Sequence, residues 1–259
     1  MKTCQANRHR NSGQVLIIAA LVITMLLLST ALYVAETEKD VPTYKSAANA
    51  DLSAYKLGIT HTVASALANI SNGGETGVLT ADLNQFQSAV ENHSYEAIME
   101  MQFTPLTSAP YQDGVWIDWS TEGRGVSSAY VAFYLNSTGT SATCRSEYAV
   151  NLTSELNLSG IYTPLNGSEK QVNVTFSVFN EGNPALAQNF TAYFEQDGSL
   201  ATEEWIPATS PTVTDYGNGT YTMSFTAETT NAGDPVLVSL YCHDTRGILI
   251  RANVTCTQV

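Results

Sequence analysis

The sequence predicts an α+β region followed by an all-β region, with one transmembrane helix before both. Three observations predict this fold class. Residues 15–34 contain no charged side chain, residues 44–70 repeat apolar residues at helical spacing, and apolar and polar residues alternate from about residue 160 onward. We therefore divide the chain into a basic leader at 1–13, a transmembrane helix at 14–35, an α+β domain at 43–160 and a β-sandwich at 161–259.

The apolar run is long enough to cross a bilayer. About twenty uncharged residues form a helix of about 30 Å, which matches the hydrocarbon core. Lys2, Arg8 and Arg10 precede the run, and acidic residues follow it. The positive-inside rule predicts a single-pass protein of the cell membrane, with a cytoplasmic N-terminus and extracellular C-terminal domains.

Three fates of this helix are consistent with the sequence. Ser29-Thr30-Ala31 offers a small-x-small site for a secretory signal peptidase, although the apolar run continues beyond it. An uncut membrane anchor needs no further feature. In the third fate, the helix contacts the membrane through residues 15–34 and also assembles with copies of itself.

The third fate depends on Gly13-Gln14. A short basic leader, a Gly, a polar residue and a long apolar helix follow one another here, over roughly residues 8–35. This order resembles the class III signal of archaeal type IV pilins. The resemblance implies cleavage between Gly13 and Gln14 by prepilin peptidase, and packing of the apolar helix into a filament core. It also implies a long helix whose lower half packs on an antiparallel sheet.

A second helical stretch is predicted after Pro42, which should end or kink the first helix. Its apolar stripe recurs at three- and four-residue steps from Tyr44 to Ile70, and Asn72-Gly73-Gly74 should end it. A shorter helix follows, with Thr80 as its N-cap. Its apolar residues are Leu83, Phe86 and Val90.

Alternating residues predict strands in both regions. Those of the α+β domain are expected at 95–103, 114–119, 128–135 and 147–158. Those of the second region are expected at 172–179, 190–195, 220–226, 236–243 and 248–256. Regular spacing with Gly and Asn turns is typical of a sandwich. The segments 172–198 and 217–247 resemble the Ig-like adhesion modules of archaeal and bacterial surface proteins, which implies a fold and not a function.

Acceptor sequences for N-glycosylation are in excess. Ten Asn-x-Ser/Thr motifs occur, where roughly four are expected by chance. Within the predicted strands, the Asn and the Ser/Thr of a motif share the polar face, so a glycan there would not disturb the core. We therefore predict an extracellular glycoprotein. The predicted acceptors are Asn69, Asn92, Asn136, Asn151, Asn157, Asn166, Asn173, Asn189, Asn218 and Asn253.

Three cysteines lie outside the leader, at Cys144, Cys242 and Cys256, and their spacing matches no metal site. Buried thiols or one disulfide are both consistent with the sequence. If Asp244–Gly247 turns a hairpin, Cys242 and Cys256 are about 23 Å apart along it, which is too far for a disulfide. The connectivity stays open.

Charge and motifs exclude several function classes. The net charge is −13, with only 11 Lys and Arg residues. Nucleic-acid binding is excluded, because the basic surface that neutralises phosphates is missing. The sequence contains no nucleophile elbow, phosphate loop or zinc-protease motif. We expect no enzyme activity, no cofactor and no metal.

Two acidic clusters and one histidine are the remaining candidates for chemistry. Asp113, Asp118 and Glu122 surround two tryptophans, Trp116 and Trp119. Paired carboxylates beside aromatic rings could hydrolyse a glycoside, but a solvated turn beside core aromatics explains them as well.

The other candidates are weaker. Asp234 and Asp244, near His243, could bind a hard cation or simply occupy turns. His61 lies beside the apolar stripe of the predicted helix, where an exposed or packed role is expected.

These observations favour a membrane-anchored extracellular structural protein, a pilin-like subunit or pseudopilin of an archaeal surface assembly. The alternative is a monomeric membrane-anchored adhesin or binding module, whose Ig-like domain contacts the cell envelope or glycans. An extracellular carbohydrate-active enzyme is the third hypothesis.

Overall fold

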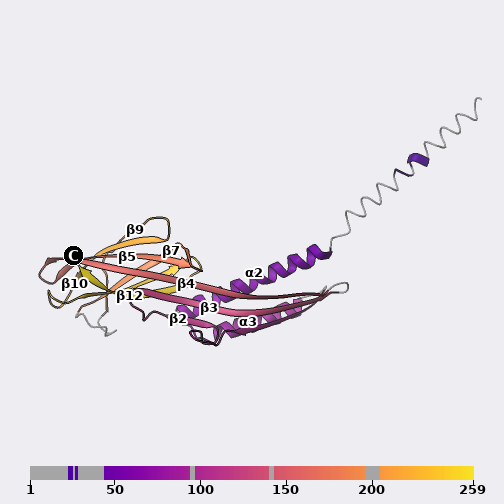
Figure 1. Ribbon diagram of the computed structural model, residues 1–259, viewed down its shortest axis with the longest axis horizontal. Helices are drawn as coiled ribbons and strands as arrows, with labels where there is room; N and C mark the ends of the chain where they lie inside the picture. Colours follow the sequence, from indigo (N-terminus) through magenta and orange to yellow (C-terminus); the bar gives the residue numbers. More distant parts are fainter. Residues whose placement is uncertain (1–22, 26, 29–43, 94–96, 140–142, 197–204) are drawn as a thin grey trace, which may run out of the picture. The chain divides into compact units, whose positions relative to one another are not determined.

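The described part of the chain is mostly β, and its helices precede the strands, as predicted (Figure 1). The computed structural model describes residues 23–25, 27–28, 44–93, 97–139, 143–196 and 205–259. Tyr55–Val259 form one compact unit, and Met1–Ala54 form another. The leader, the predicted processing site at Gly13 and Gln14, and most of the predicted transmembrane helix lie outside the described residues. Among the described residues, no helix is both long enough and apolar enough to cross a membrane.

Helix α2 (Tyr44–Ser71) ends where the sequence predicts. Gly73 takes a φ of 96°, and its N–H and that of Gly74 bond back to the carbonyls of Ile70 and Asn69. This is the left-handed C-terminal turn that glycine permits without strain. The helix buries one stripe, with the predicted spacing, in the part where side chains are described. The stripe comprises Ile59, Val63, Ala66, Leu67 and Ile70.

Helix α3 (Val78–His93) begins earlier than predicted. The N–H of Ala81 bonds to the carbonyl of Gly77, so Thr80 lies in the first turn and is not the N-cap. The prediction of Thr80 as the N-cap is therefore wrong, because the carbonyl of Gly77 already accepts the first hydrogen bond of the helix. The two helices pack closely, since a Cβ on Gly58 would lie 2.7 Å from the ring of Phe86.

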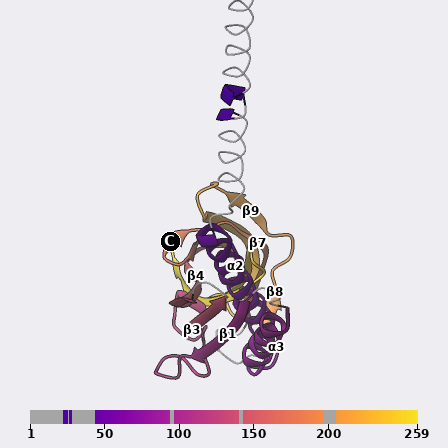
Figure 2. The same cartoon turned by 90° about the vertical axis from the view of Figure 1, so that its right-hand side faces the viewer.

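Helix α3 and the part of α2 from Tyr55 onward lie along one face of an antiparallel sheet (Figures 1 and 2). Its strands are β1 (Ala97–Pro105), β2 (Val115–Asp118), β3 (Arg124–Gly139) and β4 (Thr143–Asn166). Both β1 and β2 pair with β3, which pairs with β4. The face toward the helices is apolar, and Lys56 of α2 lies over the ring of Tyr148 of β4, 4.9 Å from its centroid.

The other strands form two halves of one sheet, and these halves enclose a shared apolar core. The remaining strands are β5 (Glu169–Asn180), β6 (Asn183–Pro184), β7 (Ala187–Glu195), β8 (Trp205–Pro207), β9 (Thr212–Asp215), β10 (Thr220–Glu228), β11 (Val236–Asp244) and β12 (Leu249–Gln258). One half, which includes the end of β4, has the order β4-β5-β10-β9, and the other half has the order β8-β7-β11-β12. A short parallel pairing of β12 with β4 joins the two halves into one continuous sheet. Leu156, Phe176, Met223, Val238 and Ile250 are among the buried residues between them.

Strand β4 belongs to both regions. Its residues Thr143–Asn157 pair with β3, and its residues Ser154–Asn166 pair with β5. The predicted domain boundary at residues 160 and 161 therefore falls inside this strand, which extends eight residues beyond the predicted end at 158. The alternation of apolar and polar residues continues through the boundary. The side chains on one face of β4 are buried first beneath the helices and then in the core of the sandwich.

The β11–β12 hairpin fastens the sandwich to the helical region. The N–H of Leu249 donates to Oγ of Ser71, 3.0 Å away, and Nε2 of His243 lies 2.9 Å from Oδ1 of Asn72. Ser127 of β3 donates its hydroxyl to the carbonyl of Leu249 at 2.7 Å. These bonds connect three segments that are far apart in the sequence, so Tyr55–Val259 fold as one unit.

Candidate functional site

The three acids around the tryptophans each have a structural role. Asp113 and Gly114, both at positive φ, form the two-residue turn that the sequence predicts, between Gln112 and Val115. Asp118 lies in a strand, as predicted, and is the last residue of β2. It accepts hydrogen bonds from the N–H and the hydroxyl of Ser120. Those bonds, more than any other effect, lower the pKa of Asp118. A carboxylate held ionised in this way suits a turn cap and not a general acid.

Glu122 joins two strands. Its Oε1 accepts a hydrogen bond from the N–H of Thr255 at 3.2 Å. The adjacent Gly123 donates to the carbonyl of Asn253 and accepts from the N–H of Leu158. Residues 122–123 thus bridge β12 and β4, a few residues before these two strands pair directly at Thr257 and Ile161.

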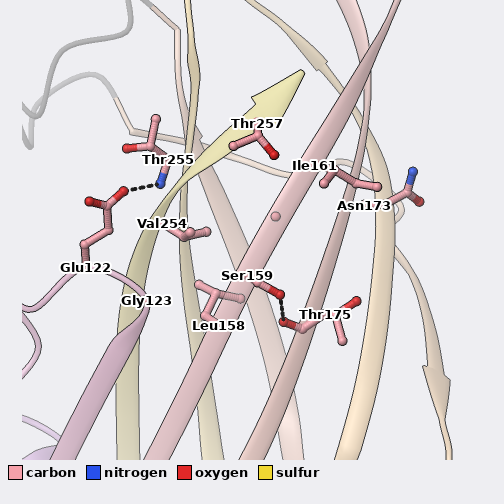
Figure 3. A pocket seen from close by; sticks show the side chains of 11 residues that line it. Glu122, Gly123, Leu158, Ser159, Ile161, Asn173, Thr175, Val254, Thr255 and Thr257 are labelled. Carbon is pink, nitrogen blue, oxygen red and sulfur yellow. Dashed lines mark hydrogen bonds between the residues drawn. The ribbon is translucent and has the colours of Figure 1, made fainter. Parts of the chain in front are cut away.

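The space beside this bridge is a hollow on the described surface (Figure 3). It has a volume of about 580 Å³. It is shallow, and Ser159, whose hydroxyl donates to the carbonyl of Thr175 at 3.3 Å, lies on its wall. Glu122 is the charged residue among its lining residues, which otherwise offer hydroxyls, one amide and apolar side chains. Such a surface can form hydrogen bonds to a polar ligand, but it does not assemble a nucleophile with a base.

The second predicted cluster is divided by a strand. Asp234 and Asp244 lie at opposite ends of β11, about 30 Å apart at the rise of a β-strand. The two carboxylates are therefore too far apart to share one cation. Asp234 accepts hydrogen bonds from Asn231, and its carbonyl accepts one from the ammonium of Lys170. Among the described residues, no three His, Cys, Asp or Glu side chains are grouped to hold a metal ion.

Asp244 forms instead the centre of a buried network that the sequence did not indicate. Its Oδ2 accepts from Nε of Arg246 at 2.7 Å and from the hydroxyl of Ser154 at 2.8 Å. Nη1 of Arg246 bonds to Oε1 of Glu181 at 2.6 Å. Burial lowers the pKa of Arg246, but its bonds to Glu181 and Asp244 outweigh that effect and raise the pKa overall. The network joins β4, the β5–β6 turn and the β11–β12 turn.

The sequence left open whether Asp244-Thr245-Arg246-Gly247 turns a hairpin, and the structure shows that these residues connect β11 and β12 in this way. Asp244 and Arg246 are two residues apart in this turn. No pattern in the sequence links them to Glu181 or Ser154, which are far away along the chain. Only the pairing of β4 with β5 brings Ser154 opposite Asn180 and next to this turn.

None of the ten predicted glycosylation acceptors is buried, although the side chains that follow them are often in the core. Seven are exposed, at Asn69, Asn92, Asn151, Asn157, Asn166, Asn189 and Asn218, and three are partly exposed, at Asn136, Asn173 and Asn253. Some amide groups are engaged in hydrogen bonds. Nδ2 of Asn92 donates to the carbonyl of Ser88 at 2.7 Å, and Oδ1 of Asn253 accepts from Ser239 at 2.6 Å.

The cysteines are free thiols in the described structure. Cys242 pairs with Ile250 and Cys256 pairs with Val236 across the β11–β12 hairpin, so the two thiols are at separate positions along it, as predicted. Both lie in the sandwich core, and burial raises the pKa of each to about 12. His61 is exposed on α2.

Comparison of the chain with family models, with curated protein sequences and with solved structures gives no match.

Proposed function

We propose that this protein is a membrane-anchored extracellular structural protein, a pilin-like subunit or pseudopilin of an archaeal surface assembly. The observation that carries the proposal is helix α2. It begins at Tyr44, soon after the predicted transmembrane run ends, and its buried stripe packs in the layer between the helices and the β1-β3-β4 sheet. A long N-terminal helix on an antiparallel sheet is the arrangement that the resemblance to pilins implies.

The proposed architecture includes an Ig-like sandwich. Its support is the strand order, because β4-β5-β10-β9 and β8-β7-β11-β12 correspond to the A-B-E-D and C′-C-F-G sheets of Ig-type domains. The parallel pairing of β12 with β4, at Thr257 and Ile161, corresponds to a contact between the last and first strands. A fold of this kind serves many functions, so the sandwich alone does not specify a ligand.

The apolar segment is the proposed contact between subunits. Ile23, Met25, Leu27 and Leu28 are all more than half exposed where the segment is described. Apolar side chains of this number need a bilayer or another helix to cover them. Acceptor asparagines on the helices and on both sheets would carry bulky glycans, which favours assembly through the apolar helix over assembly through the extracellular faces.

The test is the N-terminus of the native protein, measured by mass spectrometry. A chain that begins at Gln14 supports prepilin processing, and a Gly13→Leu variant should then retain Met1, whereas the control Ser12→Ala should still be cut. A chain that begins at Met1 contradicts the pilin mechanism and leaves an anchored protein. A start near Leu32 indicates a secreted protein and contradicts membrane anchoring.

The hollow beside Glu122 favours a second candidate function, a monomeric membrane-anchored adhesin. Hydroxyls of Ser159, Thr255 and Thr257 surround it, and such groups suit a glycan or another polar ligand of the cell envelope. Light scattering of the full chain in detergent distinguishes the two candidates. A monomer that binds purified envelope, and loses this binding in Glu122→Gln, supports the adhesin. Filaments that disappear when residues 15–34 are deleted support the structural subunit.

A further inference from the structure

Three aromatic rings form a platform on the face of the β2-β3-β4 sheet that points away from the helices. The platform comprises Tyr111, Trp116 and Tyr130. The ring of Tyr111 meets that of Trp116 edge-on, with 6.0 Å between centroids, and meets that of Tyr130 in the same way at 6.1 Å. The hydroxyls of Tyr111 and Ser128 lie 2.9 Å apart, which fixes Tyr111 in place. All three rings are partly exposed, so their aromatic surface is available to a neighbour.

An acceptor asparagine lies next to this platform. Asn151 of β4 is directly opposite Tyr130 of β3 in the antiparallel register. Residues opposite each other in such a pair have Cβ atoms about 5 Å apart and project from the same face. Asn151 is exposed, and its Oδ1 is 3.5 Å from the hydroxyl of Thr153, the third residue of the acceptor motif. The hydroxyl of Thr153 is in turn 2.7 Å from that of Ser128, beneath the platform.

We propose that Asn151 carries an N-linked glycan whose first sugars pack against the ring of Tyr130. A pyranose ring has one face of C–H groups, and their positive partial charge suits the negative face of an aromatic ring. The first sugar is attached to the side-chain amide of Asn151, directly across the strand pair from Tyr130. It therefore loses little conformational freedom when it contacts the Tyr130 ring. The glycan covers aromatic surface that would otherwise face water, and thereby stabilises this part of the fold.

Asn166 is the matched control. It is also an exposed acceptor, but it lies at the β4–β5 turn opposite Glu169, away from the aromatic platform. A glycan there is free to extend into solvent. If glycosylation stabilised the protein only by its bulk or solubility, loss of the Asn166 glycan would matter as much as loss of the Asn151 glycan.

The test combines occupancy with thermal unfolding of the full-length protein purified from its native host. Mass spectrometry of glycopeptides should find Asn151 occupied. Asn151→Gln should lower the melting temperature by about 2–4 °C, the shift expected for one favourable contact in a chain of this size. Asn166→Gln should change it by less than about 1 °C. In a Tyr130→Leu background the effect of Asn151→Gln should disappear, whereas in Tyr130→Phe it should remain, because the ring is kept.

The same substitutions in protein made in a host without N-glycosylation separate the sugar from the asparagine. There, Asn151→Gln should leave the melting temperature unchanged. An equal shift in the presence and absence of Tyr130 would overturn the proposal, and so would an unoccupied Asn151. The proposal rests on the extracellular location proposed above. If none of the ten acceptors carried a glycan, the proposed extracellular location would be contradicted too. Glycans at other acceptors but not at Asn151 would contradict only the proposed packing of a glycan on Tyr130.

Discussion

Nε of Arg246 lies 2.7 Å from Oδ2 of Asp244, whose side chain has no exposed surface. The two residues face each other across the turn that connects β11 and β12. A buried charge is tolerated only when it is paired and its remaining atoms are hydrogen-bonded. Ser154, Glu181 and two backbone N–H groups complete this requirement. The pair therefore holds the hairpin that fastens the sandwich to α2 and β3.

Substituting Arg246 should destabilise the fold severely. Arg246→Ala leaves Asp244 buried without its partner, so we expect a loss of about 3–5 kcal/mol in the free energy of unfolding. Chemical denaturation measured by tryptophan fluorescence gives this value. Arg124→Ala is the control, because Arg124 forms an ion pair with Glu155 while 48% of its side chain is exposed. That change should cost less than about 1 kcal/mol. Similar losses in the two variants would contradict the role assigned to Arg246.

A methyl group on Gly125 should separate β3 from β12. A Cβ there would lie 1.9 Å from the carbonyl oxygen of Arg251, and a backbone atom cannot move aside as a side chain does. We expect Gly125→Ala to cost at least about 1–3 kcal/mol, the range for overpacked sites. Gly233→Ala, which meets nothing within 4 Å, should be nearly neutral. If urea unfolding gave the same midpoint for both variants, the close approach of these strands would be refuted.

Ser71 should be needed to fasten the helix to the hairpin. It is buried, donates to the carbonyl of Ala68 and accepts from the N–H of Leu249, each at 3.0 Å. Ser71→Ala leaves the partly buried N–H of Leu249 without this acceptor, at a cost of about 1–3 kcal/mol. Hydrogen exchange should show a faster amide at Leu249, whereas Ser88→Ala on the exposed face of α3 should leave it unchanged. An unaltered Leu249 amide in Ser71→Ala would exclude this contact.

The core thiols should be unreactive until the chain unfolds. Because burial raises the pKa of Cys242 and Cys256 to about 12, neither is a thiolate at pH 8, and neither is accessible to a reagent. Cys144, which is partly exposed, should react with a maleimide in the native protein. Labelling in denaturant is the control and should modify the core cysteines too. Native labelling of Cys256 at the rate of Cys144 would contradict the core position.

The raised pKa values of Cys242 and Cys256 also predict that the stability of the fold depends on pH. The folded thiols keep their protons up to about pH 12, whereas unfolded thiols lose them above about pH 9. Between these values the folded state binds more protons, so the free energy of unfolding falls as pH rises. Tyr148 acts in the same direction, since burial raises its pKa as well. Urea midpoints at pH 8 and 10.5 should differ less in a Cys242→Ala, Cys256→Ala double variant than in the native sequence.

Local patterns predicted most of the secondary structure. The stripe from Tyr44 to Ile70 with its glycine stop predicted α2, and alternation predicted the long strands and their polar faces. Short strands were missed. β6, β8 and β9 have two to four residues each, which is too few for a period to appear. The turn at Asp113-Gly114 was predicted because Asp and Gly are residue types that tolerate the positive φ of such a turn.

The sequence alone determined the residue types that each surface exposes: acceptor asparagines on polar faces, an apolar segment before the helices, and no catalytic motif. Only the tertiary structure decided which of these residues meet. Tertiary packing joins residues that are 60 to 180 positions apart, such as Ser71 with Leu249 and Glu181 with Arg246. It also divides Asp234 from Asp244, places Asn151 beside Tyr130, and runs β4 through the predicted boundary. Periodicity specifies the face of a strand, but its neighbours are chosen by the global packing of the core.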